Sequence, residues 1–425
     1  MGKLKVVLVE RRLPGEKSLL HELKILAETV GYEVVGYLSQ VRYPSSKYQI
    51  GSGKVEDLAK IVKETGAERV IFENELKPVQ AYNLAKKTGV EVIDKFQLIL
   101  EVFSNHASTR EAKLQIELAK LKYELTRAKE KVRLAKLGEQ PGFHGLGKYE
   151  ADVYYEAIRR RISNIEKELQ KIRVERRIKR ALRADLGFPT VSLCGYTAAG
   201  KSTLFNTLTG ENVKISNSVF TTLSTKISAV DFDGKKALLI DTVGFIDGLP
   251  LTLIEAFKST LEETIYSNLI IVVVDCSEDV EEVKRKTKCC LDVLKEIGVI
   301  GTPIVTALNK IDLANSIRVK EAAKSISSIA SNIVPISALR KINIESLKEA
   351  VAKNLRNFVQ LSLQLPLNSE SLSLLSKIRR FSTVVNQDFH ENIILVDVKS
   401  TEHFADKILG KVEDLGGRVI EVIKV

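Results

Sequence analysis

Short apolar runs alternate with amphipathic stretches along the first hundred residues of the chain. The runs cover residues 6–9, 34–38, 70–72 and 90–93, and stretches with helical spacing cover residues 18–30, 55–65 and 78–88. Gly66 and Gly89 stand where two of these helices would end, a common place for glycine because it adopts left-handed backbone angles without strain. Strand and helix in alternation predict a small parallel sheet with helices packed on it. We therefore expect an N-terminal α/β subdomain over residues 1–105.

The pattern changes after residue 106, where apolar positions recur at steps of three and four. The recurrence runs without a break from residue 107 to 137, which is typical of one long helix with a heptad seam. Four glycines and a proline interrupt it between residues 138 and 147, and the same spacing returns over residues 150–184. Two such helices joined by a glycine-rich loop predict an antiparallel helical hairpin over residues 106–186.

From residue 187 to 360, short buried strands again alternate with helices. Residues 225–232 precede an Asp233-Gly234 turn, which favours a hairpin with the strand that follows. The other strands belong to strand–helix repeats, so the pattern predicts an α/β domain with a six-stranded, mostly parallel sheet. Strands are expected at residues 190–194, 237–240, 269–274, 304–308 and 333–336.

The tail of the chain, residues 363–425, has a different composition. Strand-like runs at residues 381–385, 393–398 and 418–425 surround a helical stretch at residues 402–415. We expect a small C-terminal α+β domain there, and we interpret residues 361–366 as the linker in front of it.

The composition is that of a globular protein. Of the 425 residues, 44% are hydrophobic and 28% are charged. The longest strongly apolar run, residues 269–274, is far shorter than the roughly 20 residues that cross a bilayer, so we expect no membrane span. The four cysteines form no C-x-x-C pair and lie in expected strands or a helix, which favours buried free thiols in a reducing compartment. We expect a monomer in the cytoplasm.

Positive charge is concentrated in the predicted hairpin. The chain has a formal net charge of +11, and residues 107–187 contribute 21 Lys and Arg against 12 Asp and Glu, an excess of nine. Arg173, Arg176, Arg177 and Arg180 follow one another at helical spacing and form one basic stripe. A solvated coiled-coil flank is the simple interpretation of this stripe, and a polyanionic partner is the alternative. The local excess favours the partner, with nucleic acid as its chemistry.

A glycine-rich stretch in the third part of the chain indicates phosphate binding. Residues 195–202 match the phosphate-loop pattern G-x-x-x-x-G-K-[ST] between an expected strand and an expected helix. In that context loop N–H groups and the helix N-terminus point together at phosphate oxygens. Lys201 would reach the β- and γ-phosphates, and the Ser202 hydroxyl would bind Mg²⁺. The residues expected to bind nucleotide here are Gly195, Tyr196, Thr197, Ala198, Ala199, Gly200, Lys201, Ser202 and Thr203.

Two later motifs indicate which base the site binds. Asn309-Lys310-Ile311-Asp312 ends an expected strand, and the Asp312 carboxylate can accept hydrogen bonds from guanine N1 and N2. Adenine lacks both donors in that place, and an unpaired buried carboxylate against it would be costly. Ser337-Ala338 ends the last strand of the sheet, where the Ala338 N–H would bond guanine O6. Together these motifs predict a P-loop GTPase domain that binds GTP and GDP.

A further motif completes the expected catalytic groups. Asp241-Thr242-Val243-Gly244 ends a strand, so that Asp241 would hold Mg²⁺ and the Gly244 N–H would sense the γ-phosphate. Thr222, in an aperiodic polar stretch, is the expected third Mg²⁺ ligand. We expect Lys201, Thr222 and Gly244 to carry catalysis. The next position, where Ras-type GTPases have a water-orienting Gln, is Phe245, so we expect slow intrinsic hydrolysis.

These motifs make the chain resemble HflX, a family of translational GTPases that act on the large ribosomal subunit. The resemblance covers roughly residues 1–360 and suits an archaeal-type member. It implies that the N-terminal domain and residues 106–186 contact ribosomal RNA, and that GTP controls subunit association and splitting. The matching runs are residues 195–197, 199–206, 220 with 222–223, 241–246 and 259–263, and in the first half residues 51–54 and 114–119.

Two departures from the family pattern affect the expected mechanism. Ala198 stands where the family usually has Asn, a residue that in related GTPases helps to bind an activating potassium ion. The glycine-rich loop lacks the Arg-rich sequence common in bacterial members. We therefore expect no potassium activation through Ala198 and no Arg-specific role for the loop.

Other interpretations stay open from the sequence alone. One is a GTP-gated RNA-processing or ribosome-assembly factor, although the tail supplies no nucleophile with its base and no metal cluster. Another is a signalling GTPase whose hairpin binds a protein, which the basic excess disfavours. Gly51-Ser52-Gly53-Lys54 is either a plain helix start or a phosphate-binding turn. His144, in the glycine-rich loop, is interpreted as a contact residue rather than a catalytic one.

Overall fold

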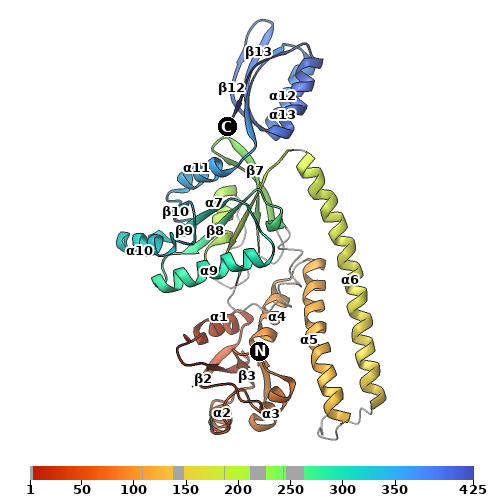
Figure 1. Cartoon of the computed structure of the whole chain (residues 1–425), viewed down its shortest axis with the longest axis vertical. Coiled ribbons are helices and arrows are strands. Elements are labelled where there is room, and N and C mark those ends of the chain that lie inside the picture. Colours follow the sequence, from red (N-terminus) through yellow and green to blue (C-terminus); the bar gives the residue numbers. More distant parts are fainter. Residues whose placement is uncertain are drawn as a thin grey trace. The chain divides into compact units, whose positions relative to one another are not determined.

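The computed structural model describes residues 3–107, 109–136, 148–185, 187–210, 226–242, 244–245 and 263–425 (Figure 1). These residues form three separate sheets with their helices. The chain divides into two compact units, and the boundary between them falls inside the long helix α6, after Ile172.

The first unit contains a four-stranded sheet in the order β2-β1-β3-β4, with all neighbours parallel. The predicted α/β alternation is confirmed, and Gly66 and Gly89 end α2 and α3 with φ of +65° and +75°. Strand β1 lies inside the sheet, which explains why residues 6–9 are all buried and all apolar. The elements are β1 (Lys5–Arg12), α1 (Leu20–Val30), β2 (Glu33–Val41), α2 (Ser52–Thr65), β3 (Arg69–Phe72), α3 (Pro78–Thr88) and β4 (Glu91–Asp94).

A helix that the sequence did not predict follows β4. Helix α4 (Lys95–His106) begins at Asp94, whose side chain accepts a hydrogen bond from the Gln97 N–H. Most of its residues up to Phe103 are buried, so its sequence shows a nearly continuous apolar run instead of an amphipathic period. That run hid the helix from a pattern-based prediction.

The predicted helical hairpin is confirmed in its described part. Helix α5 (Arg110–Lys136) and helix α6 (Lys148–Asp185) share one apolar cluster, and Arg110 pairs with Glu168 while Glu117, later in α5, pairs with Arg161, earlier in α6. This order of pairs means that the helices run antiparallel. The glycine-rich loop with His144 lies outside the described residues. The cluster contains Leu114, Leu118, Ile158, Ile162, Ile165 and Leu169.

The second unit contains a six-stranded sheet in the order β10-β9-β8-β5-β7-β6. Strand β6 is antiparallel to β7 and all other neighbours are parallel, as predicted. Strand β8 lies in the middle with residues 269–274 buried, which is why that run is uninterruptedly apolar. The strands are β5 (Thr190–Gly195), β6 (Lys226–Phe232), β7 (Lys235–Asp241), β8 (Leu269–Asp275), β9 (Ile304–Asn309) and β10 (Ile333–Pro335). The helices are α7 (Lys201–Thr209), α9 (Val280–Glu296), the 3₁₀ turn η1 (Ile311–Leu313), α10 (Ser316–Ile326) and α11 (Ile344–Asn354).

The C-terminal residues of the same unit form an antiparallel sheet in the order β12-β13-β11-β14. The interpretation of residues 361–366 as a linker is wrong, because they belong to β11, an inner strand of this sheet. Its buried residues Leu361, Leu363 and Leu365 alternate with polar ones, and they share one core with α12 and α13. The elements are β11 (Phe358–Pro366), α12 (Ser369–Phe381), β12 (Thr383–Phe389), β13 (Ile393–Thr401), α13 (Glu402–Asp414) and β14 (Arg418–Lys424).

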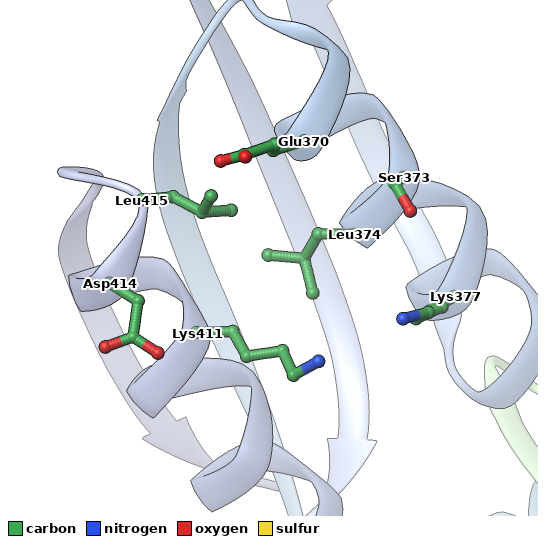
Figure 2. Close-up of a pocket in the computed structure, with 7 residues that line it drawn as sticks. All are labelled: Glu370, Ser373, Leu374, Lys377, Lys411, Asp414 and Leu415. Carbon is green, nitrogen blue, oxygen red and sulfur yellow. The ribbon is translucent and has the colours of Figure 1, made fainter.

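Helices α12 and α13 lie on the same side of the C-terminal sheet (Figure 1). A shallow hollow of about 270 Å³ lies between them, with Leu374 and Leu415 on its walls (Figure 2). Two lysines and two carboxylates line it as well, so it has no dominant charge. Across the part of the chain that the structure describes, no helix is long and apolar enough to cross a membrane.

Candidate nucleotide-binding site

The phosphate loop depends on two glycines. Gly195 has φ of +150°, and a Cβ there would fall on the Val273 carbonyl oxygen of β8. Gly200 has φ of +96°, and a Cβ there would fall on the side-chain amide of Asn309. Both angles favour glycine, and both positions lack room for any side chain. The spacing of glycines in the motif is therefore fixed by the packing of the loop against β8 and the end of β9.

Lys201 is the first residue of α7, and its ammonium group lies against the backbone of the phosphate loop. Its Nζ donates to the carbonyl oxygens of Gly195, at 3.1 Å, and Tyr196, at 2.8 Å. Burial lowers the pKa of Lys201, and the nearby Asp241 carboxylate opposes that shift. A phosphate group would give this desolvated ammonium a charged acceptor, which makes a stronger hydrogen bond than a carbonyl does.

Ser202 and Asp241 come together as the sequence predicts for a Mg²⁺ site. The Ser202 hydroxyl donates to Asp241 Oδ2 at 3.1 Å, and Asp241 is 1% exposed. A hydroxyl and a carboxylate are hard oxygen ligands of the kind that Mg²⁺ takes alongside waters and phosphate oxygens, so these residues fit the ion. The third expected ligand, Thr222, lies outside the described residues.

The residue after the Asp241–Gly244 motif, Phe245, is hydrogen-bonded to the phosphate loop. The Phe245 N–H donates to the Gly195 carbonyl at 3.0 Å, and the Thr197 N–H donates to the Phe245 carbonyl at 2.8 Å. A Cβ on Gly244 would meet Lys201 Nζ at 2.9 Å and Thr197 Cγ2 at 3.0 Å, so a side chain here would require the Lys201 ammonium to move. The Phe245 ring is 2% exposed, so it is part of the core. The two loops therefore form one hydrogen-bonded pair.

Asn309 connects three of the predicted motifs. Its Nδ2 donates to the Ala199 carbonyl at 2.9 Å, and its Oδ1 accepts the Ala338 N–H at 2.9 Å. The side chain is buried, with only 2% of the residue exposed. The sequence assigned the Ala338 N–H to guanine O6, and the structure gives it Asn309 as partner. Asn309 thus links the phosphate loop to the Ser337-Ala338 motif.

The other polar residues of the 309–312 motif, Lys310 and Asp312, have different surroundings. Lys310 has left-handed backbone angles, with φ of +66°, and its Nζ forms a 2.5 Å ion pair with Asp275 at the end of β8. Asp312 follows on η1 with its side chain exposed. Lys286 of α9 lies 4.7 Å from the centre of the Tyr196 ring. The sequence analysis did not single out Asp275 or Lys286. Asp275 could have been noticed only because it ends a strand, and no sequence pattern indicates Lys286.

One arginine of the basic stripe, Arg180, contacts the residues that precede β8. Arg180 donates to the Glu263 carboxylate at 3.2 Å and lies 4.1 Å from the centre of the Tyr266 ring. Glu263 is 6% exposed, so the pair is largely removed from water. The expectation that Arg180 contacts RNA as part of the stripe is therefore corrected, because its guanidinium is engaged within the protein. Arg177, three residues earlier, is exposed.

Three family models match successive parts of the chain. Residues 17–104 match "GTP-binding GTPase N-terminal", residues 106–183 match "GTP-binding GTPase Middle Region", and residues 190–310 match "50S ribosome-binding GTPase".

Curated relatives match nearly the whole chain. GTPase HflX of Methanocaldococcus jannaschii is 44% identical over 394 residues, which cover 93% of this chain and 96% of that protein. GTPase HflX of Thermofilum pendens is 47% identical over 366 residues, 86% of each chain. Among solved structures, a GTP-binding protein from Sulfolobus solfataricus in complex with GDP is 29% identical and covers 83% of this chain and 98% of its own, with a TM-score of 0.45. The identity to the two curated relatives, over most of the chain, shows that the chain belongs to the HflX family, GTP-binding and GTP-hydrolysing switch proteins of the ribosome-associated type.

Proposed function

We propose that this GTPase binds the large ribosomal subunit in its GTP-bound state, and that residues 106–186 and the N-terminal domain contact ribosomal RNA. We further propose that it acts as a monomer in the cytoplasm. We propose four domains, at residues 1–105, 106–186, 187–357 and 358–425. The last domain begins earlier than the predicted residue 363, so that it includes β11.

The roles proposed for the site residues are those that the sequence motifs predict, and the hydrogen bonds of Lys201 and of Ser202 with Asp241 support them. Loop N–H groups and Lys201 hold the phosphates, and the Gly244 N–H senses the γ-phosphate. Ser202 and Asp241, with Thr222, hold Mg²⁺, which neutralises charge on the phosphates when bound. Asp312 selects guanine. The remaining nucleotide-binding residues, Asn309, Lys310, Ser337 and Ala338, are proposed to shape the base pocket.

The observation that carries the ribosomal proposal is a group of exposed cations on α6. Its apolar residues pack against α5, whereas Lys171, Arg177 and Lys179 are exposed. The surrounding segment, residues 107–187, has an excess of nine positive charges, while the rest of the chain carries only two. Exposed cations gathered on one helix attract phosphate backbones and release their counterions. The family model described as a 50S ribosome-binding GTPase supports RNA of that subunit as the polyanion.

Co-sedimentation with purified large subunits tests the proposal. The variant K171Q/R177Q/K179Q should weaken binding of the full chain in the presence of a GTP analogue. It should also reduce the slope of log affinity against log salt by about 2–3, because each phosphate that the protein no longer neutralises lowers the slope by roughly 0.7–0.9. The matched control is K284Q/K288Q/K295Q, which removes three exposed lysines from α9 and should leave binding unchanged. Unchanged binding of the α6 variant, or equal wild-type binding with GDP, would refute the proposal.

The alternative, an RNA-processing factor gated by GTP, has less support. Such an activity needs a second reactive centre. Within the described residues, no group of three or more His, Cys, Asp and Glu side chains could hold a metal ion.

A further inference from the structure

The short connection between α6 and β5 is held by the C-terminal sheet and its helices. The Thr401 hydroxyl donates to the Gly187 carbonyl at 2.8 Å. Gly187 has φ of +77°, and a Cβ there would lie 2.6 Å from Thr401 Oγ1 and 2.8 Å from Phe404 Cβ. The backbone of the connection is thus seated against β13 and α13 more closely than any residue with a side chain would allow.

Three aromatic rings continue this contact. The Phe188 ring lies 5.5 Å from the Phe381 ring at 55°, and the Phe381 ring lies 5.5 Å from the Phe404 ring at 58°. These are the tilted arrangements that aromatic pairs prefer. Phe188 belongs to the connection, Phe381 ends α12 and Phe404 lies in the first turn of α13. The cluster therefore ties the connection to both helices of the C-terminal part.

The same part also contacts the β6–β7 hairpin. Lys236 Nζ donates to the Arg379 carbonyl at 2.7 Å, and the Thr383 hydroxyl donates to Asp231 at 3.2 Å. The connection leads into β5 and thus to the phosphate loop, and the hairpin leads through β7 to Asp241. Because β5 and β7 are parallel, these contacts lie at the opposite ends of the strands from the nucleotide-binding motifs. The C-terminal part therefore contacts β5 and β7 near the ends where these strands begin, away from the nucleotide-binding motifs at their other ends.

We infer that residues 358–425 act as a clamp on the α6–β5 connection. The clamp positions the last turns of α6 against the nucleotide-binding domain. Without these contacts, the connection would change conformation when β5 and β7 move, and α6 would stay in place. With these contacts, small movements of β5 and β7 also move the last turns of α6. The inference rests on the proposed function in one respect, namely that the nucleotide state must reach α6 for GTP to control RNA binding.

Amide hydrogen exchange of the full-length protein tests the clamp without ribosomes. The variants F404A and T401V are compared with wild type, with GDP and with a GTP analogue. The matched control is F389A, since Phe389 is 56% exposed at the end of β12 in the same sheet. We expect exchange in residues 173–185 to rise about fivefold or more in F404A and T401V, because local opening no longer breaks contacts to the clamp. The difference between the two nucleotide states there should shrink, and F389A should match wild type.

The outcomes separate the clamp from the ribosomal proposal. Peptides from α12 and α13 report whether F404A keeps its C-terminal fold. If it does not, T401V decides, because valine keeps the branched shape of threonine and replaces the hydroxyl that bonds the Gly187 carbonyl with a methyl group. Unchanged exchange of residues 173–185 in the folded variants overturns the clamp, as does wild-type exchange there that is the same with both nucleotides. Co-sedimentation is the second arm: if wild type binds subunits and F404A keeps its full preference for GTP, the clamp is wrong. Failure of wild type to bind refutes the ribosomal proposal alone.

Discussion

Removing the Asn309 side chain should lower both the stability of the fold and the affinity of the nucleotide site. The substitution Asn309→Ala deletes the donor to the Ala199 carbonyl and the acceptor of the Ala338 N–H, both 2.9 Å hydrogen bonds in a residue that is 2% exposed. Each backbone group would then be buried without its partner, at a cost of about 1–3 kcal/mol each. The two together lower the free energy of unfolding by about 2–6 kcal/mol.

Two measurements on the purified protein check this magnitude. At about 2–4 °C for each kcal/mol in a unit of this size, the melting temperature should fall by at least about 4 °C. Affinity for GDP should fall about tenfold or more, equivalent to about 1.4 kcal/mol, because the freed loop must be ordered again on binding.

A matched asparagine supplies the control. Asn315 is exposed and caps α10 by accepting the Arg318 N–H at 2.8 Å, so Asn315→Ala should cost only about 1 kcal/mol and leave GDP affinity unchanged. If Asn309→Ala melts within about 1 °C of wild type and binds GDP normally, Asn309 does not connect the three motifs energetically.

Four further predictions concern the base, the reaction, the monovalent cation and the thiols. Asp312→Asn should lose GTP and gain xanthosine triphosphate, because the amide offers a donor where guanine N2 needs an acceptor; a competition assay in which the variant still prefers GTP would contradict this. Intrinsic hydrolysis should be on the order of 10⁻³ per second or slower, because Phe245 is a core residue and cannot orient water. Replacing sodium with potassium should not accelerate phosphate release, because Ala198 offers no side-chain oxygen, and strong acceleration would show that another group binds the ion. Burial raises the pKa of Cys290 to about 12, so its thiolate is scarce at pH 8 and mass spectrometry after brief native alkylation should find label at Cys289 only, if anywhere.

The sequence by itself determined the features that depend on neighbours along the chain. Alternating runs set the strands of two sheets, and helical spacing set the hairpin, because side-chain periodicity follows backbone geometry. Gly195 and Gly200 were recognisable because a phosphate loop requires their backbone angles and their lack of a side chain. The order of motifs at strand ends placed the site residues at one edge of one sheet, and the structure brings the described ones together there; their roles in binding and catalysis stay predictions.

Helix α4, strand β11 and helix α12 escaped the sequence, although a signal was present for β11. The strict alternation of residues 359–365 is the signature of β11, but residues 361–366 were interpreted as a linker between two domains. Helix α4 gave no clear signal, because a helix buried on most sides has no polar face to set the period.

Only the tertiary structure decided which distant groups meet. Asn309 bridges Ala199 and Ala338 across 110 and 29 residues of sequence. Arg180 looks the same as its neighbours in the basic stripe, yet its guanidinium pairs with Glu263. The contact of Phe188 with Phe381 leaves no trace in either local pattern. Side-chain pairs of this kind depend on the packing of whole elements, since a hydrogen bond or ring contact requires positions within a few ångströms that local periodicity does not specify.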